Sequence, residues 1–315
     1  MSCPSSPVAY FVFNRPRHAE ESFAAIRARK PSELFIIADG PREKYPEDVV
    51  RCREVHKIVD VIDWPCKVHR NYSETNLGCK RRVSTGLDWV FSQVGRAIIL
   101  EDDCVASPDF FLFCDTLLER YLTDERIWVV SGNSYQPQYR NGDGSYYFSK
   151  YPDCWGWATW RRAWRHYQGE LPFLEEWKKS LRWRECFPVR VEQRYWDWIF
   201  TSVQAGKIDT WDYPWLACAI YGGGLAATPN ANLVKNIGFD NEATHTKGDD
   251  RRFSYELTPL GGMVHPSEVK PDLQADERYR KTFFANHDGL WRRLMRKVVR
   301  SADALRWSTR TCANQ

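Results

Sequence analysis

Short apolar runs alternate with amphipathic stretches through the first part of the chain. Apolar runs of about four to eight residues are typical of buried strands, and apolar residues spaced three and four apart are typical of helices. The pattern predicts strands at Val8–Asn14, Glu33–Gly40, Cys66–Tyr72, Ala97–Asp103 and Ile127–Asn133. It predicts helices at His18–Ala28, Glu47–Asp60, Cys79–Val94 and Ser107–Tyr121. This alternation indicates βαβ units and therefore an α/β fold with a mostly parallel sheet.

The second part of the chain, from Tyr146 to about Phe253, is more aromatic and less regular. No Ser/Gly-rich linker or internal repeat separates it from the first part, so we expect one continuous fold. The glycines Gly222–Gly224 predict either a mobile turn or a simple hairpin. Apolar residues recur at helical spacing from Leu290 to Trp307, with arginine and lysine on the other face. Such a helix either lies on an anionic membrane surface or packs on its own domain with a solvated basic face.

Composition narrows the class of protein. The 315 residues are 43% hydrophobic and 27% charged with a net charge of +4. This is an ordinary globular profile without a broadly polybasic surface, so we expect no nucleic acid partner. The 15 tryptophans are interpreted mainly as core residues, with the lining of a sugar-binding cleft as the alternative.

The cysteines and the N-terminal residues indicate in which cellular compartment the protein is expected. The ten cysteines contain no Cys-x-x-Cys pair, so a structural zinc site has no support. Several of them lie inside apolar runs, which fits free thiols. Residues 1–14 run directly into a strand-like segment without a signal peptide, and no apolar run reaches the roughly 18 residues of a membrane span. A reducing cytosol is the expected location.

Polar residues follow several predicted strands at the point where each strand ends. Asn14 and Arg15 follow the first strand, Asp39 and Gly40 the second, and Glu101–Asp103 the fourth. Because ligands of parallel α/β sheets bind at the carboxyl ends of the strands, we expect these pieces to meet in one site.

The stretch RAIILEDDCVASPDFF, residues 96–111, places three consecutive carboxylates beside a buried strand. Carboxylates are hard to bury and repel one another. Mg²⁺ or Mn²⁺ takes such hard oxygen ligands and keeps positions open for substrate phosphates. The alternative is a solvated acidic turn. The apolar strand before the acids and the Ser107-Pro108 helix start after them favour the metal site.

The segment AIILEDDCVASPDFFLFCDTLLERYLTDERIWVVSGNS, residues 97–134, resembles the metal-binding segment of GT-A fold glycosyltransferases. It is most similar to the N-acetylglucosaminyltransferase that initiates complex N-glycans, and bacterial nucleotide-diphospho-sugar transferases are similar as well. The resemblance extends upstream to FNRP and LFIIADG, and downstream to CWGWATW, TWDYPW, LAATPNANLVKNIG and THTKG. It covers roughly residues 7–248.

The resemblance implies a GT-A (Rossmann-like, nucleotide-diphospho-sugar transferase) fold with a mostly parallel central sheet. Its catalytic domain would span residues 7–250, with a nucleotide-binding half at 7–133 and an acceptor-side half at 134–250. Residues 251–315 would form a C-terminal extension that carries the basic amphipathic helix 290–307.

The resemblance also implies roles for the polar strand ends. Asp103 would be the direct ligand of Mn²⁺ or Mg²⁺, with Asp102 and Glu101 contacting metal-bound water or the sugar–ribose part of the donor. Arg15 would contact a phosphate, and Asp39 would accept hydrogen bonds from uracil or ribose.

Two further positions follow from the same resemblance. Lys80 falls at the nucleotide-contacting position before the third helix, although the family has a different residue there. His245 in ATHTKG corresponds to a late histidine that is a metal ligand in some GT-A enzymes, and a structural histidine is the alternative.

An inverting transfer needs a base that takes the proton from the acceptor hydroxyl. Two Trp-Asp pairs compete for this role, Asp197 in YWDWIF and Asp212 in TWDYPW. In the related enzyme the base follows a tryptophan about 17 residues before an Arg/Thr-Pro strand entry, and the distance from Asp212 to Pro229 matches this spacing. The resemblance therefore favours Asp212 over Asp197, with an aspartate that caps a helix as the alternative for both.

The sequence thus predicts a metal-dependent hexosyl- or N-acetylhexosaminyltransferase that uses a nucleotide diphosphate sugar, expected to be a UDP-sugar, with inversion. A glycan or lipid-linked glycan of bacterial surface polysaccharide synthesis is the expected acceptor. The protein would be cytoplasmic or peripheral at the inner membrane. A sugar nucleotidyltransferase is one alternative, but FNRPRHAEES lacks the Gly-rich loop that holds a triphosphate. A non-catalytic carbohydrate-binding protein is another, but it would not need the acidic strand end.

Overall fold

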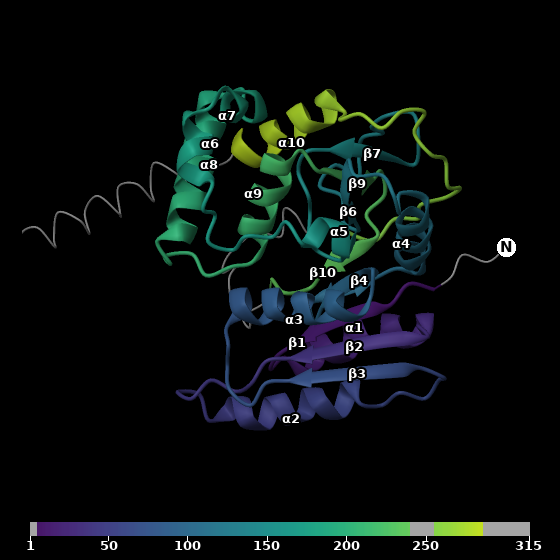
Figure 1. Ribbon diagram of the computed structural model, residues 1–315. Helices are drawn as coiled ribbons and strands as arrows, with labels where there is room; N and C mark the ends of the chain where they lie inside the picture. The colour runs from purple at the N-terminus through teal and green to yellow at the C-terminus, as the bar shows by residue number, and fades with distance from the viewer. Residues whose placement is uncertain (1–4, 240–254, 286–315) are drawn as a thin grey trace, which may run out of the picture.

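The computed structural model describes residues 5–239 and 255–285, and an eight-stranded sheet forms its centre (Figure 1). The strands lie in the order β3-β2-β1-β4-β8-β6-β9-β7. Their bounds are β1 Val8–Val12, β2 Glu33–Ala38, β3 Lys67–Tyr72, β4 Arg96–Glu101, β6 Ile127–Ser131, β7 Tyr146–Ser149, β8 Trp157–Trp160 and β9 Leu225–Pro229. A separate antiparallel pair is formed by β5 (Cys104–Ala106) and β10 (Val234–Asn236).

The direction of the strands divides the sheet in two. β3, β2, β1 and β4 are parallel, with α1 (Pro16–Arg29), α2 (Glu47–Val59) and α3 (Cys79–Gln93) between them in the chain. β8 then runs antiparallel to both β4 and β6, while β9 is parallel to β6 and β7 is antiparallel to β9. Every strand of this sheet except β8 and β7 therefore shares one direction, and the predicted α/β class with a mostly parallel central sheet is confirmed.

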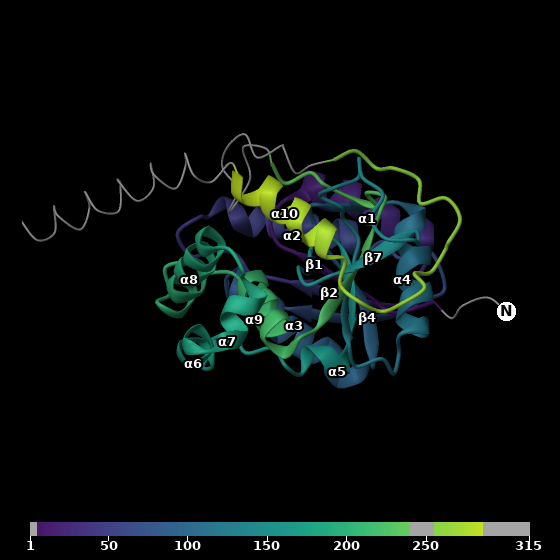
Figure 2. The same ribbon diagram turned by 90° about the horizontal axis from the view of Figure 1, so that it is seen from above.

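Helices cover both faces of the sheet because successive residues of the buried strands point to opposite sides. Tyr10 of β1 packs in a core with α1, α2 and α4 (Pro108–Arg120), whereas Phe11 packs in a second core with α3 and the later helices. Figure 2 shows α1 and α2 on one side of the sheet and α3 and α5 on the other. The later helices are α5 Arg161–Trp164, α6 Leu174–Lys179, α7 Leu181–Cys186, α8 Arg190–Gln204, α9 Asp212–Gly222 and α10 Leu273–Ala285.

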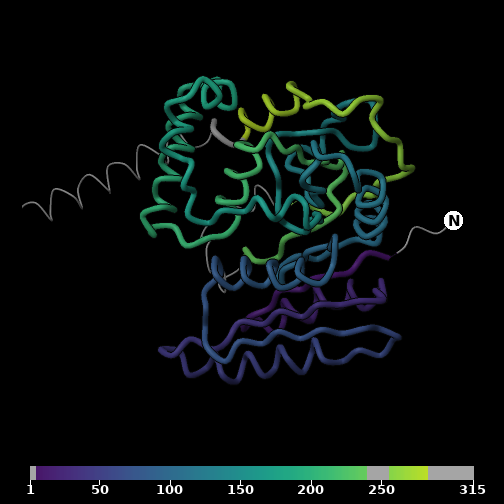
Figure 3. Tube along the Cα trace, viewed as in Figure 1, coloured from purple at the N-terminus to yellow at the C-terminus, as the bar shows by residue number. Residues whose placement is uncertain are grey.

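Each strand and helix predicted between Val8 and Asn133 is present, with slightly different ends. α4 begins as predicted, with Pro108 as its first residue and the Ser107 Oγ accepting from the Phe110 N–H at 3.3 Å. In Figure 3 the purple and blue strands of the first part of the chain lie in the lower part of the view, and the green and yellow segments lie above them. The less regular second part of the chain therefore continues the same sheet instead of forming a separate one.

The glycines Gly222–Gly224 connect a helix to a strand, so of the two alternatives the simple hairpin is wrong. α9 ends at the first of them, Gly223 is the helix C-cap with a φ of 77°, and β9 begins at Leu225. A Cβ on the first or third glycine would overlap the indole ring of Trp128. The missing side chains thus let the end of α9 pack directly against this buried ring.

Most tryptophans of the described residues are core residues, as predicted. The buried ones are Trp64, Trp128, Trp157, Trp160, Trp164, Trp177, Trp183, Trp196, Trp211 and Trp215. The cysteines that the structure describes within these ranges are free thiols, as their positions in apolar runs indicated.

α10 packs on the second part of the sheet. The Ser149 Oγ at the end of β7 donates to Asp276 at 2.6 Å, and the rings of Tyr151 and Tyr279 stack with centroids 4.5 Å apart. The predicted domain boundary at residue 250 and the predicted basic helix 290–307 lie outside the described residues. Within residues 5–239 and 255–285, no helix is long and apolar enough to cross a membrane.

Candidate active site

A cavity of about 360 Å³ lies at the carboxyl ends of β1, β2 and β4, and its size is in the usual range for small-molecule sites. The start of α3 and three segments of the second part of the chain complete its walls: residues 154–155, residues 209–212 and residues 236–239 at the end of β10. Its polar and aromatic lining residues include Phe13, Arg15, Asp39, Arg42, Asn76, Cys79, Arg82, Glu101, Asp102, Asp103, Cys154, Trp155, Asp209, Trp211 and Asp212. The polar ends of these three strands therefore meet in one site, as their positions in the sequence predicted.

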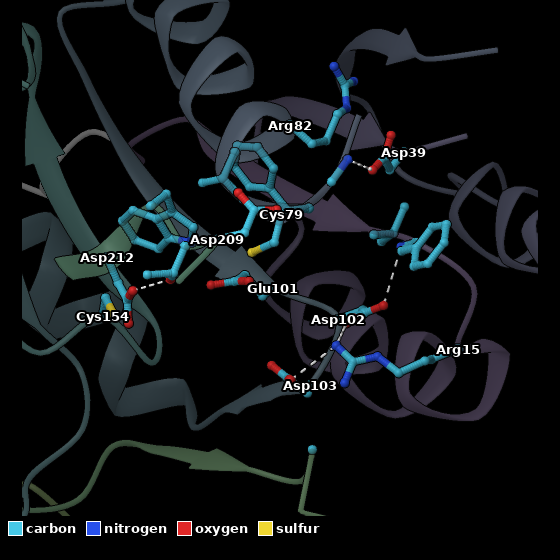
Figure 4. Close-up of a pocket in the computed structure, with 18 of the residues that line it drawn as sticks. Arg15, Asp39, Cys79, Arg82, Glu101, Asp102, Asp103, Cys154, Asp209 and Asp212 are labelled. Carbon is cyan, nitrogen blue, oxygen red and sulfur yellow. Dashed lines mark hydrogen bonds and ion pairs between the residues drawn. The ribbon is translucent and has the colours of Figure 1, made fainter. Parts of the chain in front are cut away.

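Glu101, Asp102 and Asp103 form an acidic turn at the end of β4 (Figure 4). The Nη2 of Arg15 donates to Asp102 and, at 3.0 Å, to the Oδ2 of Asp103. The second oxygen of Asp102 accepts from the Phe13 N–H at 3.3 Å. Both oxygens of Asp102 are thus engaged within the protein, so this carboxylate anchors the turn.

The acidic turn concentrates negative charge in a poorly solvated place. Burial raises the pKa of Glu101 well above its usual value, and repulsion from Asp103, Asp102 and Asp212 raises it further. Burial also raises the pKa of Asp102, while the positive charge of Arg15 acts in the opposite direction. These shifts show that the single arginine does not neutralise the turn.

The oxygen donors of this turn fit a hard divalent cation, because Glu101 and Asp103 line the cavity and crowd negative charge there. Within the described part of the chain, no three His, Cys, Asp or Glu side chains are arranged to hold a metal ion. Mg²⁺ is commonly held by one or two carboxylates together with substrate phosphates. The turn can therefore supply one or two carboxylate ligands to such an ion.

Asp39 lies at the end of β2 and lines the cavity, but its oxygens are occupied. One oxygen accepts from the N–H groups of Gly40 and Leu77 at 2.9 and 2.8 Å. The other accepts from the Gly78 N–H at 3.1 Å and the Asn76 Nδ2 at 3.0 Å. Burial raises the pKa of Asp39, and the backbone donors act against this shift. The carboxylate therefore holds the loop 76–78 in place at the cavity wall.

Two arginines that the sequence did not single out lie in the cavity wall. The guanidinium of Arg42 lies 4.0 Å from the ring centroid of Tyr45 and 5.5 Å from that of Phe13, and its Nε donates to Asp48 at 2.6 Å. Arg82 of α3 lies beside Asp39 in Figure 4, and burial lowers its pKa. Both guanidinium groups are engaged within the protein, that of Arg42 by Asp48 and that of Arg82 by the backbone and side-chain oxygens of Asn71, so they shape this end of the cavity beside the ring of Phe13.

Asp212 is the first residue of α9 and lines the cavity. Its Oδ1 accepts from the Thr210 hydroxyl and from the Tyr213 N–H at 2.8 Å. Figure 4 shows Asp212 next to Cys154, on the opposite side of Glu101 from Arg15. The structure thus brings Asp212 into the same cavity as the acidic turn.

The competing aspartate lies elsewhere. Asp197 is in the middle of α8 with a side chain that is 50% exposed, and it pairs with Lys178 at 2.8 Å. It is absent from the lining of the cavity in the described structure. Of the two Trp-Asp pairs, only that of Asp212 lies in the cavity with the acidic turn in the described residues.

Three other predicted positions fall outside the cavity or outside the described residues. The Lys80 Nζ pairs with Glu170 at 2.8 Å and does not line the cavity. The Asn14 Nδ2 donates to Asp48 at 2.6 Å, so it joins the end of β1 to α2. His245 lies outside the described residues.

The cavity also contains residues that the sequence did not indicate. Cys79 and Cys154 line it, and burial raises the pKa of both thiols, which keeps them protonated at neutral pH. Asp209 lies in the loop before α9, and a Cβ on Gly78 would come 3.2 Å from its Oδ2. The position of Asp209 beside the TWD motif is a signal that the sequence offered, whereas nothing in the sequence distinguishes these two cysteines from the others.

No protein-family model matches the chain, and no curated protein matches it. Among solved structures, the galactosyltransferase LgtC in complex with donor and acceptor sugar analogs is 12% identical with a TM-score of 0.37, over 89% of this chain and 95% of that one. Mouse xyloside xylosyltransferase 1 is 9% identical with a TM-score of 0.32, over 68% and 80% of the two chains. The 4-diphosphocytidyl-2C-methyl-D-erythritol synthase of Anaerococcus prevotii is 11% identical with a TM-score of 0.31, over 62% and 84%. Similarities at these scores assign neither a reaction nor a substrate to this chain.

Proposed function

We propose that this protein is a glycosyltransferase that moves a sugar from a nucleoside diphosphate donor, a UDP-sugar, to a hydroxyl of a glycan or lipid-linked glycan, with inversion. The observation that carries the proposal is the cavity that joins the acidic turn Glu101–Asp103 to Asp212 on one side and to cationic and aromatic residues on the other. A carbohydrate-binding protein would have no use for such crowded carboxylates.

The donor's diphosphate would lie at the acidic turn together with Mn²⁺ or Mg²⁺, which supplies positive charge to the phosphate leaving group. Asp103 and Glu101 would hold the ion, since Asp102 is engaged by Arg15 and Phe13. The nucleoside would extend toward Phe13 and Arg82, beside the loop that Asp39 holds.

Asp212 would act as the base. Its carboxylate takes the proton of the acceptor hydroxyl while that oxygen forms a bond to the anomeric carbon. The bond from the anomeric carbon to the phosphate oxygen breaks, and the nucleoside diphosphate leaves with the electron pair. Attack from the side opposite to the leaving group inverts the configuration of the anomeric carbon.

The test is a nucleotide-release assay over a panel of donor sugars with Mn²⁺ or Mg²⁺, using the wild type and Asp103→Ala. We expect UDP release from one or a few donors, and its loss after chelation of the metal or in Asp103→Ala. Glu268→Gln, at an exposed ion pair with Lys270 outside the cavity, is the matched control for removing an acidic side chain. Unchanged release in Asp103→Ala would overturn the role of the acidic turn.

The same preparation distinguishes the nucleotidyltransferase alternative. That class makes a nucleotide sugar and pyrophosphate from a nucleoside triphosphate and a sugar phosphate. Pyrophosphate release from these substrates, without UDP release from any donor sugar, would replace the proposed function with that one. The short connection from β1 through Arg15 to Pro16 of α1, which has no glycine-rich loop, favours transfer of the sugar.

A further inference from the structure

The segment that follows β10 packs directly on the acidic turn. β10 pairs with β5, placing Asn236 beside Cys104. The Ile237 N–H then donates to the backbone oxygen of Asp103 at 2.8 Å. The Gly238 N–H donates to the side chain of Asn236, also at 2.8 Å. These bonds fix the backbone of Gly238 next to the carboxylate of Asp103.

The space at this contact admits only a glycine. A Cβ on Gly238 would lie 3.1 Å from both the Cβ and the Cγ of Asp103, and closer still to its Oδ2. This Oδ2 is the oxygen that accepts from Arg15 at 3.0 Å. An added methyl group would therefore displace the carboxylate from the position in which Arg15 holds it.

The carboxylate has no easy way to yield. Its backbone is bonded to residue 237, and its side chain is only 18% exposed. Rotation of the side chain would break the ion pair with Arg15 and turn the oxygen away from the cavity. A steric change at Gly238, which is distant from Asp103 in the sequence, is thus transmitted to one oxygen of the acidic turn.

We propose that Gly238 is a positioning residue for Asp103, which keeps the carboxylate in the orientation that binds the cation and the donor diphosphate. The inference rests on the proposed function for the ligand that it names. The contact itself is independent of that function.

A double-mutant cycle tests this inference, with wild type, Gly238→Ala, Asp103→Ala and the double variant. Gly95→Ala is the matched control, because a Cβ there meets nothing within 4 Å. Thermal unfolding and calorimetric titration of UDP with and without Mn²⁺ are measured for each protein. We expect Gly238→Ala to weaken Mn²⁺-dependent UDP binding about tenfold or more. In the Asp103→Ala background the contacts with Cγ and Oδ2 are gone and only the 3.1 Å contact with the Cβ remains. Gly238→Ala should therefore lower the unfolding temperature much less there than in the wild type, and it should not weaken Mn²⁺-dependent binding further.

The possible results distinguish the contact between Gly238 and Asp103 from the proposed function of the protein. An equal loss of unfolding temperature from Gly238→Ala with and without Asp103 would overturn the inference, whether or not the protein binds UDP. Coupling in unfolding without coupling in Mn²⁺-dependent binding would reduce Gly238 to a packing residue and would also overturn it. If the wild type binds no UDP or other nucleoside diphosphate while the unfolding cycle shows coupling, the proposed function fails and the contact stands.

Discussion

At the scale of single residues, the position of Asp212 separates it from Asp197 more clearly than the motifs do. Asp197 and Asp212 each follow a tryptophan, and the two residues lie close to each other in the chain. One lies in the cavity with the acidic turn, and the other pairs with Lys178 on the surface of α8. A base must reach the acceptor proton directly or through one water, and the place of Asp212 in the cavity supports our proposal that it is the base.

We expect Asp212→Asn to lower the rate of sugar transfer by about 10² to 10⁴-fold while UDP binding remains, because the amide cannot take the proton. Asp197→Asn is the matched control and should transfer sugar at nearly the wild-type rate. Initial rates of transfer and calorimetric UDP affinity are the measurements. Wild-type transfer in Asp212→Asn would move the base to another residue.

Asp39 gives a second prediction at this scale. Its carboxylate accepts four hydrogen bonds, three of them from backbone N–H groups. In Asp39→Asn the amide group would face a donor, leaving a buried N–H without a partner at a cost of about 1–3 kcal/mol. We expect the free energy of unfolding in urea to fall by that amount and UDP affinity to fall with it. Asp63→Asn, at an exposed ion pair with Arg27, should leave both quantities near their wild-type values.

The sequence could place Asp39 in the site but could not give its role. Three of its four hydrogen-bond donors are backbone N–H groups, those of Gly40, Leu77 and Gly78, and backbone groups leave no trace in the residue types. The ion pair between Lys80 and Glu170 could not be predicted either, because the two residues are distant in the chain. A resemblance to a family predicts which residue occupies a site, whereas the hydrogen-bond and ion-pair partners of that residue depend on the fold of this particular chain.

At the scale of elements, most of the parallel half of the sheet was predictable, because β1, β2 and β4 are continuous apolar runs and apolar residues recur at helical spacing between them. β3, with the sequence KVHRNY, gave a weaker signal. In the second half of the sheet only β6 was predicted. β8 is the four-residue segment WATW, which has no alternation and is flanked by further aromatic residues. β5 and β10 are three residues each, and they pair only because the chain brings Cys104 and Asn236 together.

The start of α4 gives a prediction at this scale. The Ser107 Oγ accepts from the Phe110 N–H at 3.3 Å and shares this donor with the carbonyl oxygen of Ser107, which lies 3.1 Å away. We expect Ser107→Ala to lower the free energy of unfolding by about 1 kcal/mol, measured in urea. Ser92→Ala is the control, since this exposed serine donates only to the carbonyl of its own helix. An unchanged unfolding curve for Ser107→Ala would mean that water replaces the cap.

At the scale of the whole molecule, α10 is joined to the sheet through a buried carboxylate. Asp276 accepts from Ser149 at 2.6 Å and lies near the charges of Lys150 and Asp272. Burial raises the pKa of Asp276 to about 6, from a usual value of 3.8. The folded protein therefore holds this proton more tightly than the unfolded chain.

The contribution of this group to stability is full below about pH 4 and is lost as the pH rises through 6. The shift corresponds to at most about 3 kcal/mol between these limits. We expect Asp276→Asn to remove that part of the pH dependence, seen as a smaller difference between free energies of unfolding at pH 4.5 and pH 7. Glu277→Gln, exposed on the same helix, is the control. A pH dependence that is the same in Asp276→Asn and the wild type would contradict the shifted pKa.

The reversed direction of β8 determines which loops of the second part of the chain reach the cavity, and therefore where related sequences are expected to differ. Because β8 is antiparallel to β4, it starts at the edge where β4 ends, and the loop that carries Cys154 and Trp155 reaches the acidic turn from the second part of the chain. The strand ends of the parallel half build one side of the cavity, and this loop, the one before α9 and residues 236–239 build the other. The loops before β8 and α9 lie outside the parallel half in the sequence, so a change in them leaves the sequence of the β1, β2 and β4 ends unaltered. We expect relatives with different acceptors to differ mainly in these loops, and chimaeras that swap them to change the acceptor while keeping the donor nucleotide.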